Sequence, residues 1–166
     1  MAPESPIAGY APPAERPPLL GYAGLMGAFN ALVAAGAFAF RRSGREMPER
    51  VALGDLLNIG VASHKLSRLV AKDKVTSPLR APFTEFEEPG GPSEFEEGAR
   101  GTGLRRALGE LLVCPYCLGL WAVAGFSFGL LFAPRATRLV ASVFSALTVS
   151  DFLQIAYKAA EEKGLG

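Results

Sequence analysis

The stretch CPYCLGLWAVAGFSFGLLFA, from Cys114 to Ala133, decides what kind of fold this chain can adopt. It contains no charged side chain, and a helix of roughly 20 mainly apolar residues is what crosses the core of a bilayer. Two other stretches have the same character: Leu19 to Phe40 carries no charge, and Leu139 to Tyr157 carries one, Asp151. Soluble helices rarely continue so far without charges. The sequence therefore predicts an integral membrane protein.

Working outward from this stretch, we expect an all-α, multi-pass fold in five parts. They are a disordered Pro-rich arm at 1–18, a transmembrane helix at 19–40, an amphipathic helix at 51–72, a loop with an acidic repeat at 73–103, and a short helix with a transmembrane hairpin at 104–160. The first apolar run is longer than the roughly 7–15 residues of a signal-peptide core, and the arm precedes it. We therefore expect a retained anchor.

The helix at 51–72 decides the number of membrane crossings. Apolar residues share one of its faces and cations crowd the other, which is typical of a helix that lies in the membrane interface. Each cation exposed to lipid near the bilayer centre would cost roughly 2.5–3.5 kcal/mol. We therefore favour three transmembrane helices plus this interfacial helix, with residues 41–110 in the cytoplasm. In the alternative, this helix is a fourth crossing and the acidic loop lies outside the cell.

The overall charge argues against a nucleic-acid partner. The chain has 17 Lys and Arg residues against 16 Asp and Glu residues, so it has no strong positive field. The sequence shows no phosphate-binding loop, pair of catalytic carboxylates or nucleophile elbow. We expect membrane lipids as partners, a second copy of the chain or another membrane protein as a further partner, and no cofactor.

The two cysteines, Cys114 and Cys117, allow three interpretations. Cys-Pro-Tyr-Cys has the form used by glutaredoxins, in which a helix N-terminus lowers the pKa of the first thiol, and Pro115 suits the first position of a helix. The sequence has no strand-helix-strand pattern around it, which excludes the glutaredoxin fold. A redox site would use Cys114 as nucleophile and Cys117 as resolving thiol. A metal site would add His64, although structural zinc usually needs four ligands. We favour the third interpretation, in which both thiols pack at a helix entry.

A second candidate site is basic. Cations along the amphipathic helix and just after it suit anionic lipid headgroups or ion pairs, at about 1 kcal/mol for each cation near an anionic surface. Asp151 in the last apolar helix is a buried-carboxylate candidate, and such groups usually have a partner. We expect a cation of the amphipathic helix to pair with it. The candidate lipid-binding or ion-pairing residues are His64, Lys65, Arg68, Lys72, Arg80 and Asp151.

Several short motifs between His64 and Tyr157 occur together in one known family. They are Arg68-Leu69, Asp73, Pro78-Leu79-Arg80-Ala81-Pro82-Phe83, Gly101-Thr102-Gly103-Leu104-Arg105, Cys114-Pro115-Tyr116-Cys117-Leu118-Gly119 with Trp121, and Ser150-Asp151-Phe152. With them the chain resembles the bacterial family catalogued as domain of unknown function 1360. The resemblance implies a small bacterial membrane protein and supplies no activity.

We therefore predict a multi-pass protein of the bacterial inner membrane with a structural or accessory role, acting through helix packing and through lipid or protein contacts. A membrane thiol-disulfide oxidoreductase and a metal-binding module, both using the same two thiols, are the alternatives. We favour a protein that is not an enzyme.

Overall fold

The structure is a computed structural model that describes residues 9–12 and 16–164. Much of the arm expected at 1–18 therefore lies outside the described residues. The elements in chain order are α1 (Leu19–Arg42), α2 (Leu53–Lys72), the 3-10 turn η2 (Lys74–Thr76), α3 (Ser77–Arg80), β1 (Thr84–Pro89), β2 (Phe95–Ala99), α4 (Gly103–Leu112), α5 (Pro115–Phe132) and α6 (Pro134–Gly164). The chain is mostly helical, as the sequence predicts.

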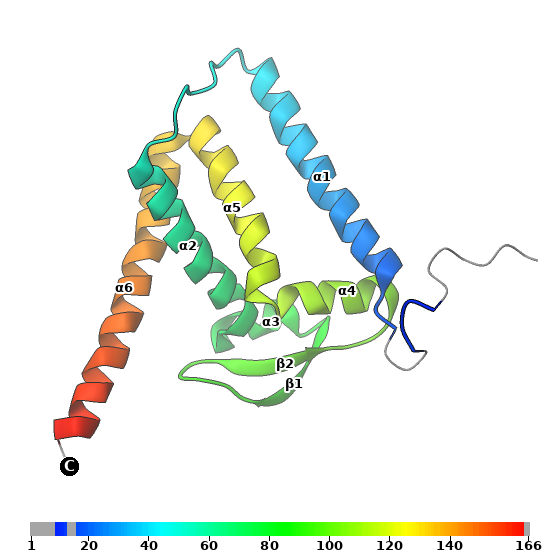
Figure 1. Cartoon of the computed structure of the whole chain (residues 1–166), viewed down its shortest axis with the longest axis vertical. Coiled ribbons are helices and arrows are strands. Elements are labelled where there is room, and N and C mark those ends of the chain that lie inside the picture. The colour runs from blue at the N-terminus through cyan, green and yellow to red at the C-terminus, as the bar shows by residue number, and fades with distance from the viewer. Residues whose placement is uncertain (1–8, 13–15, 165–166) are drawn as a thin grey trace, which may run out of the picture.

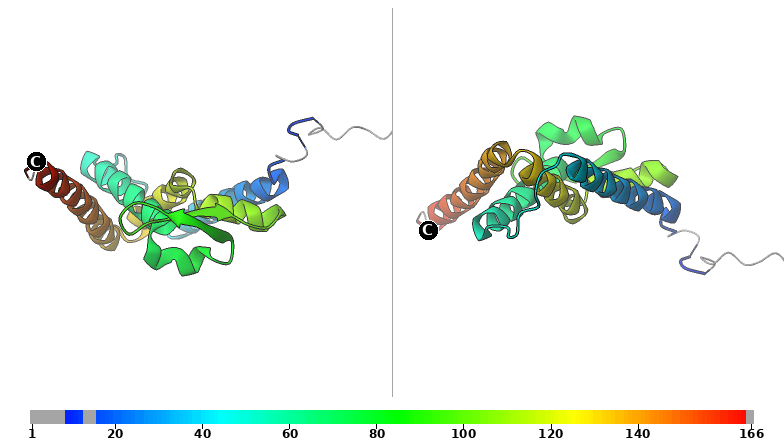
Figure 2. Two further views of the ribbon diagram at one scale, coloured as in Figure 1. Left: turned by 90° about the horizontal axis from the view of Figure 1, so that it is seen from below. Right: turned by 90° about the horizontal axis from the view of Figure 1, so that it is seen from above.

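Four long helices stand side by side in a row (Figure 1). Seen from below and from above, along the helices, the order across the row is α1, α5, α2, α6, with α1 and α6 on the outside (Figure 2). The long helices alternate in direction along the chain, so α1 and α5 run one way and α2 and α6 run the other way. The helix α2 packs lengthwise against both α5 and α6 rather than across their ends.

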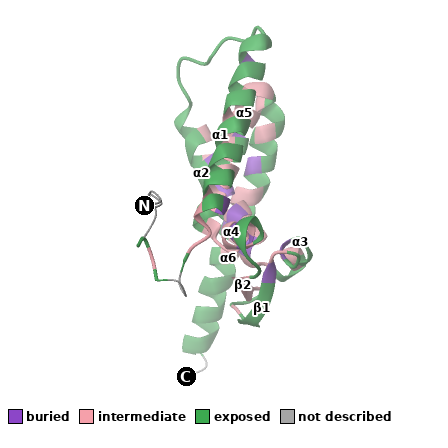
Figure 3. Cartoon of the chain, turned by 90° about the vertical axis from the view of Figure 1, so that its right-hand side faces the viewer, coloured by how far each residue is buried: buried purple, intermediate pink, exposed green. Residues whose placement is uncertain are grey.

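The apolar helices are not buried inside the protein. The helices α1, α5 and α6 are each long and apolar enough to cross a membrane. In the most apolar stretch of each helix, however, only 6%, 6% and 11% of the residues, respectively, are buried inside the protein. Figure 3, in which α1 faces the viewer, shows mostly green exposed ribbon on α1 and on the C-terminal part of α6. A surface this apolar is unfavourable in water and matches the hydrocarbon of a bilayer. Within the part of the chain that the structure describes, these three helices correspond to the three transmembrane candidates predicted from sequence, and α2 does not meet the same criterion of length and hydropathy.

Small and large apolar side chains pack together between the long helices. The centre of the packing contains Ile59 and Ala62 from α2, Phe126 from α5 and Ala141 from α6. At the other side of α5, α1 makes edge-to-face aromatic contacts, with the rings of Phe29 and Trp121 5.1 Å apart between centroids. Such close helix contacts are usual where small residues let the backbones approach.

A compact unit covers one end of the long helices; below, an end of the row means the side at which the helices begin or end. We call residues 73–113 the cap; it comprises η2, α3, the β1–β2 hairpin and α4 (Figure 1). The two strands pair antiparallel, with Thr84 opposite Ala99 and Pro89 opposite Phe95, and with an irregularity between Phe86 and Glu88. We call the opposite end of the row, residues 41–55 and 134–138, the basic end.

The fold is mainly all-α, as predicted, with two short strands. These strands lie in the segment at 73–103, which the sequence predicts as a loop, and the acidic repeat of that segment forms them. Glutamate has a low intrinsic strand propensity. The phenylalanines of the repeat, Phe86 and Phe95, stack edge to face across the strands at 5.2 Å. Glutamates of the second strand find cations on neighbouring helices, so tertiary contacts override the local preference.

Candidate functional site

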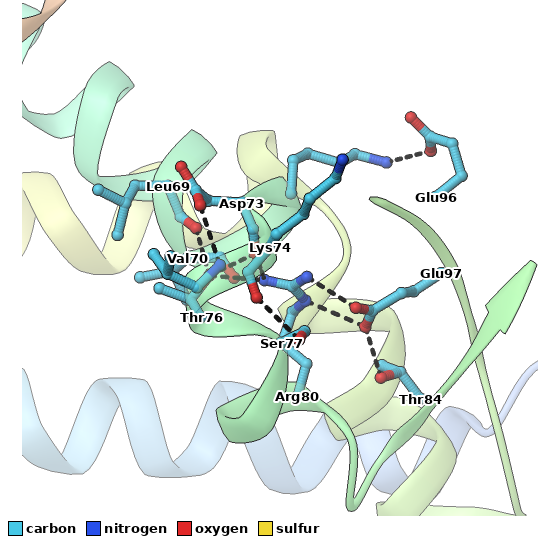
Figure 4. A network of polar contacts seen from close by, with 12 residues as sticks. Leu69, Val70, Asp73, Lys74, Thr76, Ser77, Arg80, Thr84, Glu96 and Glu97 are labelled. Atoms are coloured by element: carbon cyan, nitrogen blue, oxygen red, sulfur yellow. Dashed lines mark hydrogen bonds and ion pairs between the residues drawn. The ribbon is translucent and has the colours of Figure 1, made fainter. Parts of the chain in front are cut away.

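The centre of the cap is a fully buried guanidinium group. Arg80 has no exposed side-chain surface, and Glu97, its carboxylate partner, is only 5% exposed. Arg80 donates two hydrogen bonds to Glu97, at 2.7 and 3.0 Å, in a bidentate geometry (Figure 4). The hydroxyl of Thr84 donates a third hydrogen bond to the same carboxylate, at 2.7 Å. Buried charges are stable only when they are paired and hydrogen-bonded in this way.

The remaining donors of Arg80 bind the end of α2. Its Nη1 donates to the carbonyl oxygen of Val70 at 2.7 Å, to that of Asp73 at 3.1 Å, and to the hydroxyl of Thr76 at 2.7 Å. The Asp73 side chain in turn accepts the backbone N–H of Val75, which starts the 3-10 turn. Arg80 therefore joins three elements: the C-terminus of α2, the turn after it, and strand β2.

These contacts set the ionisation of Glu97. Burial by itself would raise the pKa of this carboxyl, but the hydrogen bonds from Arg80 and Thr84 and the positive charge of Arg80 outweigh it. The net result is a pKa below the ordinary value, so Glu97 is ionised at neutral pH. The pair is a structural clamp whose charges are both satisfied.

Two more ion pairs join α2 to the hairpin. Arg68 donates to both carboxylate oxygens of Glu94 at 2.8 Å, and Lys72 contacts Glu96 at 2.6 Å. With Arg80 and Glu97, the second half of the acidic repeat is thus neutralised by neighbouring cations. The three exposed glutamates of β1, Glu85, Glu87 and Glu88, take no part in any ion pair within the described part of the chain.

Asp151 pairs with α2, as expected, and the partner is Lys65. The two charged atoms lie 2.5 Å apart, and the side chains are 17% and 45% exposed, respectively. This pair belongs to a line of polar contacts between α2 and α6. Near the basic end of the row, Arg138 makes a bidentate contact with Asp55 at 2.8 Å, and between the two ion pairs the hydroxyl of Ser145 donates to Asn58 at 2.8 Å.

The cysteines lie where the cap meets α5. Cys114 is the N-cap residue of α5 and Pro115 occupies its first turn, as the sequence predicted. The two cysteines form a disulfide, and the backbone N–H of Cys117 donates to the sulfur of Cys114 at 3.2 Å. Cys114 is half-buried, whereas Cys117 is exposed and Tyr116 between them is 93% exposed. The disulfide is therefore accessible to solvent at the sulfur of Cys117.

His64 is exposed on α2 and does not complete a metal site with the cysteines. Within residues 9–12 and 16–164, no three His, Cys, Asp or Glu side chains are grouped closely enough to hold a metal ion. Of the six basic or acidic candidates, Lys65 and Asp151 are brought together, while Arg68, Lys72 and Arg80 are directed to the hairpin. Lipid binding by these residues stays a prediction.

The motifs that carry these contacts also mark a family. The model of the family described as "Protein of unknown function (DUF1360)" matches residues 50–157, which include α2, the cap and α5, and most of α6. The chain belongs to this family. The resemblance noted from Arg80, the cysteine motif and Asp151 is thereby confirmed, and the family description states no activity.

One curated relative gives a first hint of biology. "Sporulation protein YjcA" of Bacillus subtilis (strain 168) is 39% identical over 71 residues, which is 41% of this chain and 59% of the relative. The chain thus matches less than two thirds of the length of that relative. No solved structure matches this chain significantly.

Sequence reasoning missed the acceptors of the clamp. The sequence placed Glu94, Glu96 and Glu97 in a solvated loop. In the structure this segment folds back as a hairpin, and the three glutamates pair with Arg68, Lys72 and Arg80. The alternation of Glu and Phe at period two in both halves of the repeat was the available signal. The contact between Asp55 and Arg138 had no signal in the sequence, because the two residues are 83 positions apart.

Proposed function

We propose that this family member is a four-crossing protein of the bacterial cytoplasmic membrane that has a structural or accessory role and carries its cap on the outer face. The observation that carries this proposal is the position of α2. It lies lengthwise between two membrane-length helices, α5 and α6, so a membrane that holds these two helices also holds the part of α2 packed between them. The interfacial orientation favoured by the sequence would place α2 across their ends instead.

The acidic and basic side chains of α2, Asp55, Lys65, Arg68 and Lys72, support a crossing because each is ion-paired. Its contacts with α6 keep a nearly constant sequence separation, 83 for Asp55 with Arg138 and 86 for Lys65 with Asp151, as in two parallel helices in register. The cost of a charge near the membrane falls when it is paired and faces another helix rather than lipid. The remaining cations, Arg68 and Lys72, lie at the cap and bind its glutamates.

The disulfide at the cap supports the orientation, since disulfides persist in oxidising compartments and are rare in the cytosol. The two ends of the row differ in net charge: the basic end carries six Arg residues against three acidic residues, and the cap carries five Lys and Arg residues against eight acidic residues. The rule that Lys and Arg collect on the cytoplasmic side counts cations and not net charge, so six against five favours neither end.

The accessory role rests on the construction of the cap. Its charged groups that reach α2 are used in mutual pairing, which fixes the hairpin to the membrane helix. A surface of this kind, with the three glutamates of β1 exposed, suits contact with other molecules at the membrane better than chemistry on a small substrate. The name of the Bacillus relative extends the proposal to a sporulation-related membrane process.

The topology is tested by a matched pair of Glu→Cys variants. In a background without native cysteines (Cys114→Ser with Cys117→Ser), Glu49→Cys reports the basic end and Glu88→Cys reports the cap, and both positions are exposed. A membrane-impermeant maleimide should label Cys at 88 in intact cells and Cys at 49 only after the cells are opened. Labelling of both positions only in opened cells would mean that both ends are cytoplasmic, which would return α2 to the membrane interface and overturn the proposal.

The sporulation link is tested by complementation. The chain is expressed in a Bacillus subtilis strain that lacks the YjcA protein, and spore yield is compared with that of strains carrying the native protein or no protein. Restored yield supports a shared role. Unchanged yield, with the chain shown to be present in the membrane, contradicts this part of the proposal.

A further inference from the structure

We propose that the Cys114–Cys117 disulfide is a thiol-disulfide exchange site that accepts two electrons from a protein dithiol, and that the incoming thiolate attacks Cys117. This activity goes beyond the accessory role and does not depend on it. It also assigns the two cysteines roles opposite to those expected from the comparison with glutaredoxins.

Exposure decides which sulfur is attacked. Cys117 is exposed in the first turn of α5, and its neighbour Tyr116 is 93% exposed, so the approach from solvent is open on this side. Cys114 is half-buried at the junction of α4 and α5. Attack on a disulfide requires a line of access to the sulfur that forms the new bond, and access is one of the factors that set the rate.

The local backbone decides which sulfur leaves. Cys114 is the N-cap residue of an 18-residue helix, and its sulfur accepts the backbone N–H of Cys117 at 3.2 Å. The free N–H groups and the dipole at a helix N-terminus stabilise negative charge, as they do for reactive thiolates. When the bond between the two sulfurs breaks, the geometry therefore favours the release of Cys114 as the thiolate.

The complete step balances as follows. A thiolate of the partner attacks the sulfur of Cys117, a mixed disulfide forms, and the bond to Cys114 breaks, leaving its thiolate. The second thiolate of the partner then attacks the partner's own sulfur in the mixed disulfide and releases the Cys117 thiolate. The partner is oxidised from a dithiol to a disulfide, and this protein is reduced from a disulfide to a dithiol. The two protons lost by the partner thiols are available to the two released thiolates.

The position of the site fits a protein substrate at a membrane surface. The disulfide lies at the cap end of the row, where the short helix α4 meets α5. An exposed tyrosine is typical of the boundary between membrane and water. Because Cys117 is an exposed residue, the substrate class that fits is an extended dithiol segment of another protein rather than an enclosed small molecule.

The first test locates the mixed disulfide. The oxidised full-length protein in lipid nanodiscs is treated with reduced glutathione, quenched with acid, and digested with chymotrypsin, which cleaves after Tyr116 and separates the two cysteines for mass spectrometry. We expect glutathione on Cys117 and a free thiol on Cys114, in a ratio of at least roughly ten to one. An adduct found mainly on Cys114 would overturn the assignment of the attacked sulfur. A disulfide that reacts only after the protein is denatured would overturn the exchange site altogether and leave a structural crosslink.

The second test uses the matched single variants. Iodoacetamide alkylates Cys114 in Cys117→Ser and Cys117 in Cys114→Ser, and the rates are measured from about pH 8.5, the usual pKa of a free thiol, down to mildly acidic pH. Cys114 should keep a larger fraction of its rate as the pH falls, because the helix N-terminus stabilises its thiolate. Equal pH profiles for the two thiols would remove the argument for Cys114 as the leaving group. Neither readout depends on membrane topology, so the result is independent of the labelling experiment above.

Discussion

Replacing Arg80 with alanine should release the cap from α2. The substitution removes the partner of Glu97, a carboxylate that is 5% exposed, and also leaves the carbonyl oxygens of Val70 and Asp73 without their donor. Removing one member of a buried ion pair typically costs about 3–5 kcal/mol, because the other charge stays buried without compensation. About 1.4 kcal/mol corresponds to a factor of ten in an equilibrium constant. The equilibrium constant for opening of the hairpin should therefore rise by roughly 100-fold to 3,000-fold.

Native-state hydrogen exchange of the full chain in nanodiscs measures this opening. The backbone N–H groups of β1 and β2 should exchange faster in Arg80→Ala by the factor above, while those in the middle of α5 should change little. Arg68→Ala is the matched control, because it also removes an arginine from a bidentate pair with a hairpin glutamate. The side chain of Arg68 is 50% exposed, so the loss should be at most about 1 kcal/mol, or roughly fivefold.

Two results would refute the reasoning. If Arg80→Ala and Arg68→Ala accelerated hairpin exchange equally, burial would not be what makes the inner pair important. If the double variant Arg80→Leu with Glu97→Leu were as open as Arg80→Ala, the cost would not come from an unpaired buried carboxylate, because the double variant contains none. We expect the double variant to recover a measurable part of the stability.

Three further predictions concern pH, packing and the ion pair between Lys65 and Asp151. The pKa of Glu97 is lowered in the folded state, so its contribution to cap stability is fully present above the ordinary value of 4.5 and is lost as the pH falls through the lowered value. The hydrogen-exchange rate of the backbone N–H groups in β1 and β2, corrected for its intrinsic pH dependence, should therefore be constant near neutral pH and rise only in acid. A rise in this rate at pH 6–7 would contradict the prediction. Gly21→Ala should lower the unfolding temperature, because an added Cβ would lie 2.7 Å from the nearest side chain of α4, whereas Gly27→Ala has open space and should have almost no effect. Asp151→Asn should weaken the packing of α2 on α6, measured as faster exchange in α2, and the charge swap Lys65→Asp with Asp151→Lys should restore part of it; a swap no better than the single variant would mean that the pair contributes nothing.

The predictable parts of this protein are those governed by local composition. The helices α1, α5 and α6 follow from long uncharged runs, and the start of α5 follows from Pro115, whose fixed φ and missing N–H suit a first helical turn. The pairing of Asp151 with a cation of α2 was also predictable, since an isolated charge in an apolar helix needs a partner. Which cation it would be, Lys65 rather than Arg68, was not, because that depends on the rotation of α2 against α6.

The cap was not predictable from local patterns. Glu94, Glu96 and Glu97 become acceptors only when the chain turns back at Thr76 to Arg80 and brings the hairpin under the end of α2. The sequence by itself determined which segments prefer a bilayer, because hydrophobic transfer depends on the composition of each segment. Only the tertiary structure decided that α2 packs among those segments. It also decided that the glutamates in the second half of the acidic repeat are paired with cations, and that Cys117 is the exposed residue of the disulfide. The physical reason is that charge pairing and side-chain exposure depend on distances between residues far apart in the chain, which the order of amino acids does not state.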